Sequence, residues 1–449
     1  MTSLRSDLRL AWELTRGSDR GEWWRVTLTA TGAVLATGFA LAAVTLASLR
    51  GIYDVPVGAG LLDQPGTRSG MVTGLVLLLV PVLGFLGQCA RMGAVHRDRR
   101  LAELRLAGAT PWQVRRIAAL ETGLACLLGS AIATVFSVLL LLRLWNRPTP
   151  LVWTGIALVA AAVPLLGAAA GALALRRVVA SPLGWVRRVA PRTGRGPGLL
   201  FLAGFLLVAV LALLATATTT AAANRPNGEW YLTLTGAILA VGAGAVWLSG
   251  AAAKATGRLL AVRARTAATL IAAERLRHDP WSAARTHAAV LLVTVVGTGF
   301  MGIRQVMGDM VRTRKLSAPV SYYTTGLDLT GTAIAIAFAI TLSGLAVGTA
   351  ESLATRRRGL AAQAAAGVPQ AVLGRALLLE TALPLAPAVL LAGVGGTAIG
   401  IWYALLSGRP VPWVPALVPV AVYAACLLAA ATSLPLLRRS VHPGELRYA

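Results

Sequence analysis

The amino-acid sequence predicts an all-α, polytopic membrane protein with about ten transmembrane helices. Of its 449 residues, 56% are hydrophobic and only 13% are charged, and the mean hydropathy is +0.71. Soluble globular proteins are about 45–50% apolar and about 25% charged. The charged residues occur in short groups between long apolar runs, whereas a transmembrane barrel would show alternating segments of about 9–11 residues. The composition therefore excludes a soluble enzyme and indicates a multi-span helical protein.

Ten segments are long and apolar enough to cross a bilayer, which takes about 20 residues per helix. They lie near residues 26–47, 71–91, 117–142, 151–175, 199–223, 230–252, 287–306, 329–350, 376–404 and 414–437. Of the 42 Lys and Arg residues, 32 fall in one set of alternate connections and 10 in the other. By the positive-inside rule, both termini are expected in the cytoplasm and the protein in the cell membrane.

The net charge of +25 follows from this topology. The basic residues flank apolar segments, where they can meet anionic lipid headgroups. No folded soluble region presents a nucleic-acid-binding face, so the lipid bilayer is an expected partner and nucleic acid is not. The three cysteines, Cys89, Cys126 and Cys426, lie singly within or beside apolar segments, which predicts buried free thiols.

The chain contains an internal repeat. Residues 97–108 align with residues 356–367 at an offset of 259, and the same offset pairs Glu121 with Glu380. Each copy comprises a lead-in helix followed by four spans, and two further spans join the copies. Because six spans separate their starts, the two copies run in the same direction, unlike the halves of inverted-repeat transporters.

The repeat extends upstream of this segment. Several residues between 11 and 39 match residues between 272 and 300 at an offset of 261. The expected domains are a first repeat at 1–180, a linker with two joining spans at 181–253, and a second repeat at 254–449.

The sequence predicts the local structure of the loop that follows the second span in each copy. In the first copy, residues 97–107 are charged and favour a helix, which Gly108 ends as its C′ residue. The sequence Thr110-Pro-Trp-Gln113 then gives a capping box, with its proline at the first helical position. The second copy retains Gly367 and Pro369. The pattern predicts a short cytoplasmic helix, a tight turn and a long helix leading into the next span.

Residues 97–121 resemble the signature of the FtsX-like permease family, the membrane subunits of type VII ABC transporters. Members typically show a charged stretch, then Glu-x-x-x-Leu-x-Gly-Ala, Gln-Val and a glutamate that opens the next span. The matching residues are Glu103, Leu106, Gly108, Ala109, Gln113, Val114 and Glu121 in the first copy, and Gly367, Arg375 and Glu380 in the second. The ten-span layout of four, two and four helices resembles the bacitracin-export (BceB-type) permeases.

The resemblance implies that residues 97–109 and 356–368 are coupling helices, each held in a cleft of an ABC ATPase subunit. One chain would then bind an ATPase dimer, with ATP and Mg on the ATPase and no cofactor bound directly by this chain. The residues expected to couple to the ATPase are Arg97, Arg99, Arg100, Glu103, Leu106, Gly108, Ala109, Arg356, Arg358, Gly367 and Val368. Binding of lipid headgroups by these Arg-rich segments is the alternative.

The sequence carries no motif for nucleotide hydrolysis. A P-loop requires Gly-x-x-x-x-Gly-Lys-Ser/Thr, and the two lysines, Lys254 and Lys315, follow Ala253 and Arg314. The four histidines form no His-Glu-x-x-His motif, so metal-dependent hydrolysis has no support. We therefore expect a permease subunit that is not itself an enzyme, with ATP hydrolysed by a separate subunit.

One feature departs from the family pattern. Permeases of the ten-span type usually carry a large extracellular domain between spans seven and eight, whereas that connection here is only about residues 304–328. The short connection argues against peptide capture by such a domain. It also argues against an external adaptor protein of the kind that MacB-type exporters bind.

Two carboxylates, Glu121 and Glu380, lie at matching positions about one helical turn inside the membrane, where a lone carboxylate is costly. They could serve proton coupling or form structural ion pairs with nearby arginines, and their place near the cytoplasmic interface favours the structural role. At the external ends, Arg50, Arg143, Arg304 and Arg409 could attract an anionic substrate or act as interfacial anchors.

Residues 4–16 and 258–277 have amphipathic patterns and are expected to form helices along the cytoplasmic membrane surface. In the segment 258–277, the apolar residues expected to be buried are Leu259, Leu270 and Leu276. Both segments resemble the elbow helices that precede each permease repeat.

We expect the permease subunit of an ATP-dependent exporter that acts on a hydrophobic or amphiphilic compound, such as a peptide antibiotic or a lipid. The alternative is a mechanotransmission or signalling subunit that controls a cell-wall enzyme or a sensor kinase without transport. A proton-coupled secondary transporter, in which the two intramembrane glutamates would carry protons, is the third possibility.

Overall fold

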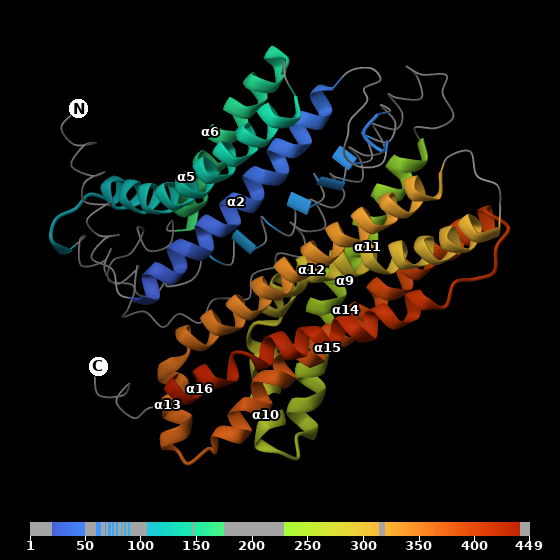
Figure 1. Ribbon diagram of the computed structural model, residues 1–449. Coiled ribbons are helices and arrows are strands. Elements are labelled where there is room, and N and C mark those ends of the chain that lie inside the picture. Colours follow the sequence, from blue (N-terminus) through green and yellow to red (C-terminus); the bar gives the residue numbers. More distant parts are fainter. Residues whose placement is uncertain are drawn as a thin grey trace. The chain divides into compact units, whose positions relative to one another are not determined.

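The computed structural model describes residues 20–49, 60–63 and 68, ten positions between 71 and 89, and residues 106–145, 148–174, 229–313 and 319–440. All regular structure in these segments is helical, with no strand among them (Figure 1). The chain divides into two compact units, Met1–Ala190 and Pro191–Ala449. The predicted all-α fold is confirmed.

Seven helical segments within the described residues are long and apolar enough to cross a membrane. They are Val26–Ser48, Trp112–Leu144, Pro150–Ala169, His287–Thr313, Val320–Ala354, Gln370–Leu406 and Val414–Leu437. Each coincides with one of the ten predicted spans. Of the other three, 230–252 lies within a long helix, 71–91 is described only at scattered positions, all of them helical, and 199–223 lies outside the described residues.

Among its described residues, the first unit has three continuous helices that pack against one another: α2 (Arg20–Ser48), α5 (Pro111–Leu144) and α6 (Pro150–Ala174). Side chains from all three form an apolar cluster that includes Leu41, Leu141 and Val152. α2 and α5 approach closely at Gly129, where a Cβ atom would overlap the carbonyl oxygen of Ala30. Small residues allow membrane helices to pack at such short range.

The second unit is a larger helical assembly. Its helices are α9 (Glu229–Arg263), α10 (Ala267–His278), α11 (Pro280–Thr313), α12 (Val320–Thr355), α13 (Arg357–Ala365), α14 (Gln370–Leu406), the 3-10 helix η1 (Val414–Ala416), α15 (Leu417–Ala431) and α16 (Leu434–Ser440). α14 contacts α9, α11 and α15 (Figure 1). The core of the unit lies among these helices and α12, around Leu291, Leu345 and Leu385.

The backbones of α11 and α14 meet directly. A Cβ atom at Gly396 would lie 2.6 Å from the Val295 carbonyl oxygen and 2.6 Å from Thr298 Cβ. One turn further along, a Cβ atom at Gly302 would lie 2.7 Å from the Cα atom of Gly400. Lipid tails are as apolar as the helix surfaces, so close van der Waals packing of this kind is a main source of helix association in membranes.

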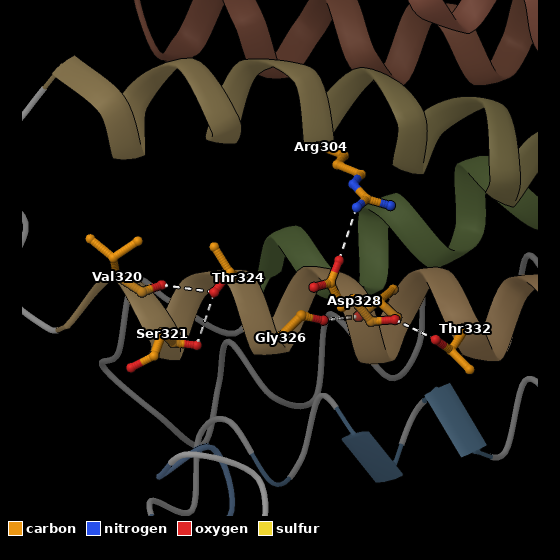
Figure 2. A network of polar contacts seen from close by, with 8 residues as sticks. Arg304, Val320, Ser321, Thr324, Gly326, Asp328 and Thr332 are labelled. Atoms are coloured by element: carbon orange, nitrogen blue, oxygen red, sulfur yellow. Dashed lines mark hydrogen bonds and ion pairs between the residues drawn. The ribbon is translucent and has the colours of Figure 1, made fainter.

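The connection between the seventh and eighth predicted spans is shorter than expected. α11 continues to Thr313 and α12 starts at Val320, so residues 314–319 separate them, not residues 304–328. Figure 2 shows how polar residues are accommodated: Arg304 Nη2 on α11 lies 2.9 Å from Asp328 Oδ1 on α12. The hydroxyl of Thr332 donates to a carbonyl of its own helix. These bonds let the polar sequence stay helical.

The predicted amphipathic segment 258–277 is two helices, not one. Residues 258–263 end α9, and a new helix, α10, starts after Thr266 because Thr266 and Thr269 form a capping box. In this box the Thr266 side chain accepts from the Thr269 N–H at 3.3 Å. Leu276 is buried as predicted, whereas Leu259 and Leu270 are exposed at the protein surface.

The direct contact between α11 and α14 predicts a stability effect for Gly396→Ala. The added methyl group would overlap backbone, so we expect a loss of about 1–3 kcal/mol in the free energy of unfolding. Gly308→Ala on α11 is the matched control, since no atom lies within 4 Å of a Cβ there. Thermal unfolding in detergent should show a lower Tm for the first variant alone; equal Tm values would contradict the packing described.

Candidate functional site

The short helix predicted in the second repeat is present. α12 ends at Thr355, α13 spans Arg357–Ala365, and α14 starts at Gln370. Arg356 is both the last residue before α13 and its N-cap. A long helix, a helix of nine residues and a second long helix therefore follow one another with almost no loop between them.

A Schellman motif ends α13. The Gly367 N–H donates to the Ala364 carbonyl at 2.9 Å, and the Val368 N–H donates to the Gln363 carbonyl at 3.1 Å. Gly367 has a φ of +88°, a left-handed conformation that glycine adopts without steric cost. The predicted role of Gly367 as the helix-ending residue is confirmed.

The first repeat has the same turn with an additional cap. Gly108 has a φ of +97°. Thr110 Oγ1 accepts from the Gln113 N–H at 3.3 Å, and Gln113 Oε1 accepts from the Thr110 N–H at 2.8 Å. With Pro111 at the first helical position of α5, the predicted capping box is confirmed. Four of the predicted coupling residues, Arg97, Arg99, Arg100 and Glu103, lie outside the described residues.

The second repeat lacks that side-chain cap. Its N-cap is Pro369, which makes no side-chain hydrogen bond, although its carbonyl accepts from the N–H groups of Val372 and Leu373 at 3.0 and 3.3 Å. A proline has neither a hydroxyl nor an N–H. The start of α14 therefore depends on other contacts.

One face of α13 provides such contacts. Leu360 is 4% exposed and belongs to an apolar cluster with Leu373 and Leu377 of α14. Leu353 of α12 and Leu437 of α16 complete this cluster, and Ala364, Val368 and Ile271 of α10 pack against it. α13 thus contributes to an apolar cluster that side chains of four other helices share.

The opposite face of α13 is exposed and carries small side chains. Gly359, Ala362, Ala365, Ala366 and Gly367 are all exposed, and we call them the alanine–glycine face. Arg357 is exposed at the start of the same helix. A surface of this kind lets another protein approach the helix backbone closely.

The described end of the first coupling segment presents large apolar groups. Leu106 is 73% exposed, and Trp112, in the first turn of α5, is 65% exposed. Ala109, between them, is partly buried. Exposed aromatic and aliphatic side chains beside a tight turn are the kind of surface that protein partners cover.

Glu380 on α14 forms ion pairs with arginines from two other elements. Its Oε1 atom lies 2.7 Å from Arg275 Nη1 on α10, and its Oε2 atom lies 3.0 Å from Arg356 Nη1 at the start of α13. These pairs favour the structural interpretation of the Glu380 carboxylate over proton coupling. Glu121, at the matching position on α5, is 6% exposed.

Sequence reasoning missed three residues of this region. Arg275 lies 105 residues from Glu380 in the chain, and the repeat alignment gives no sign of it because the matching position is Leu14. Trp112 was considered only as part of the capping sequence, and Leu360 was not singled out.

Two of the four external arginines singled out in the sequence, Arg304 and Arg409, have partners in other elements. Arg304 pairs with Asp328 (Figure 2), and Arg409 Nη2 donates to Thr313 Oγ1 at 2.6 Å. Both bonds join separate elements at the end of α11. They support the role of these arginines as anchors.

Within the described residues, no three His, Cys, Asp or Glu side chains are placed to hold an ion. Cys89, Cys126 and Cys426 are buried and unpaired, as predicted. The surfaces around the two glycine turns remain the candidate site.

The left-handed conformation of Gly367 gives a test with a matched control in α13. Gly367→Ala should cost about 1–2 kcal/mol in the free energy of unfolding. Gly359→Ala, inside the helix, should instead stabilise the protein by about 0.5–1 kcal/mol. No atom lies within 4 Å of a Cβ at either position, so only the backbone conformation differs. Thermal unfolding should show Tm shifts of opposite sign; a shared sign would refute the assignment.

Comparison with known proteins supports the family predicted from the motif. No curated protein matches the chain. Residues 71–183 match the family model of the FtsX-like permease C-terminal domain. The matched region contains the first glycine turn, α5 and α6. Residues 71–183 are thus similar to an FtsX-like permease C-terminal domain, in agreement with the sequence motif.

Proposed function

We propose that this protein is the permease subunit of an ATP-binding-cassette exporter for a hydrophobic or amphiphilic compound, such as a peptide antibiotic or a lipid. The observation that carries the proposal is the repeated turn at Gly108 and Gly367, both in the left-handed conformation and 259 residues apart. The FtsX-like permease match supports it, because members of this family are the membrane components of ABC-type systems.

In this proposal, residues 97–109 and 356–368 are the coupling helices that receive the ATPase. The alanine–glycine face of α13 would enter a cleft on one ATPase subunit, where small side chains permit close approach. Leu106 and Trp112 would provide apolar contacts on the first side, together with the charges of Glu103 and its neighbouring arginines. The unequal charge of the two segments predicts that the first grips the ATPase more strongly.

Two coupling helices in one chain suit an ATPase dimer. Each subunit of the dimer would bind one coupling helix, which gives one permease chain per two ATPase subunits. ATP and Mg would be bound by the ATPase alone. ATP-driven closure of the dimer would then push both helices and move the spans that follow them, α5 and α14.

The proposed substrate enters from the bilayer. α5 exposes a row of large apolar side chains that includes Ile132, Phe136 and Leu140, so lipid contacts much of this helix. At the other end, α11 and α12 are separated only by residues 314–319. A short connection of this kind has no room for a folded capture domain. Both termini and both coupling helices are proposed to lie in the cytoplasm.

Capture of the ATPase tests the proposal. Ala362→Arg places a long charged side chain on the exposed face of α13, and Leu106→Arg does the same in the first repeat. Each should weaken capture of a candidate ATPase from the host about tenfold or more, as loss of a central interface contact does. The measurement is a pull-down of the detergent-solubilised chain at graded ATPase concentrations.

Ala267→Arg is the matched control, because Ala267 is an exposed alanine at the start of α10, outside both coupling segments. It should leave ATPase capture unchanged. If the wild-type chain binds no ATPase in any nucleotide state, the proposal fails. If it binds an ATPase but reconstituted vesicles move no amphiphilic compound with ATP, the mechanotransmission or signalling role replaces export.

A further inference from the structure

Glu380 joins three structural elements through a single carboxylate. Arg275 comes from α10, Arg356 from the junction of α12 and α13, and Glu380 itself from α14. The Glu380 side chain is 13% exposed, and those of Arg275 and Arg356 are 25% and 35% exposed. Each carboxylate oxygen binds one guanidinium, at 2.7 and 3.0 Å. Charge-assisted hydrogen bonds in a partly buried site are stronger and more directional than neutral ones.

We propose that Glu380 is a positioning residue that fixes α10, the start of α13 and α14 in one register, so that a displacement of α13 reaches α10 and α14 together. The proposal rests on the proposed function, in which a partner ATPase displaces α13. It adds a specific path for the movement and a role for Arg275, which lies outside both coupling helices.

Apolar packing alone does not set this register. The cluster around Leu360 and Leu373 holds α13 against α14, but hydrophobic contact is non-directional and tolerates small sliding movements. The two ion pairs define where the start of α13 stands relative to α10 and α14. Arg356 is well placed for this role because it is the N-cap of α13 and the residue that separates α13 from α12.

Movement of α10 would continue into α9. The two helices pack backbone to backbone, because a Cβ atom at Gly257 would lie 2.9 Å from the Arg277 nitrogen and 3.0 Å from the Ala273 carbonyl oxygen. Ala268, Ala272, Ala273 and Leu276 of α10 are all buried. The path therefore runs from α13 through Glu380 to α10 and then to α9.

The full arrangement belongs to the second repeat. In the repeat alignment, Arg356 and Glu380 match Arg97 and Glu121, but Arg275 matches Leu14. A leucine cannot form an ion pair with a carboxylate. The ion pair between Glu380 and Arg275 of α10 therefore distinguishes the second repeat from the first at the level of sequence.

Distance measurements on the isolated chain test the register without any ATPase. Spin labels at Ala362 on α13 and Leu270 on α10 occupy exposed positions, after the three buried cysteines are replaced by alanine. Glu380→Gln should broaden the distance distribution between the labels, because α13 and α10 lose the carboxylate that both bind through an arginine, while their apolar packing remains. A distribution that coincides with that of the unsubstituted chain would overturn the proposal.

Two further variants keep the test decisive if Glu380→Gln folds poorly. Arg275→Gln removes only the bond to α10 and should broaden the same distribution while Arg356 remains paired. Arg277→Gln is the matched control, since it breaks the exposed pair with Glu274 within α10, at 2.7 Å, and keeps the Cγ atom that packs near Gly257 of α9. Equal effects of Arg275→Gln and Arg277→Gln would also overturn the proposal.

A second readout separates positioning from mere stabilisation. With the ATPase bound, addition of ATP should shift the distance between α10 and the exposed Leu406 at the far end of α14. Arg275→Gln should retain ATPase capture and lose this shift, and a retained shift would contradict the proposal. If no ATPase binds the wild-type chain, the proposed function fails, whereas the ATPase-free distances still decide the role of Glu380 in the register.

Discussion

The bilayer constrains this protein more than any other factor, because its interior offers no water to a backbone N–H or carbonyl. Long helices satisfy that constraint because they pair their backbone groups internally. The hydroxyls of Thr294 and Thr332 are satisfied in the same way, since they donate to carbonyls of their own helices. Changes of direction are then confined to helix ends. Gly108 and Gly367 lie at two of these changes in the left-handed conformation, directly before the segments in which α5 and α14 begin.

The two turns share a geometry that is stabilised in different ways. In the first repeat, the capping box of Thr110 and Gln113 starts α5 through contacts three residues apart. In the second repeat, Pro369 provides no side-chain cap, and α13 and α14 are held by the cluster around Leu360 and by the ion pairs of Glu380. Local bonds therefore define the start of α5, whereas contacts between distant parts of the chain hold α13 and α14.

That difference explains what could be predicted from sequence. Apolar length located seven spans, and glycine and capping chemistry located both turns, because these signals depend on neighbouring residues. The predicted connection between α11 and α12 was too long. The Arg304–Asp328 pair helps polar residues there to remain helical, and it joins positions 24 apart, so no neighbouring residues signal it. Arg275, one of the two partners of Glu380, was missed for the same reason. The repeat alignment offered only Leu14 at the position of Arg275.

Under the proposed function, the different stabilisation of the two turns affects how each repeat would respond to ATP-driven movement. A helix that turns about a single glycine can pivot unless something else holds its far end. α13 has Gly367 at one end and Arg356, bound to Glu380, at the other. A push on its alanine–glycine face would therefore translate α13 together with α10 and α14, with little pivoting about Gly367. A carboxylate alone in the membrane would be costly. Because two arginines share the Glu380 carboxylate, it instead holds α10, the start of α13 and α14 together in the second repeat.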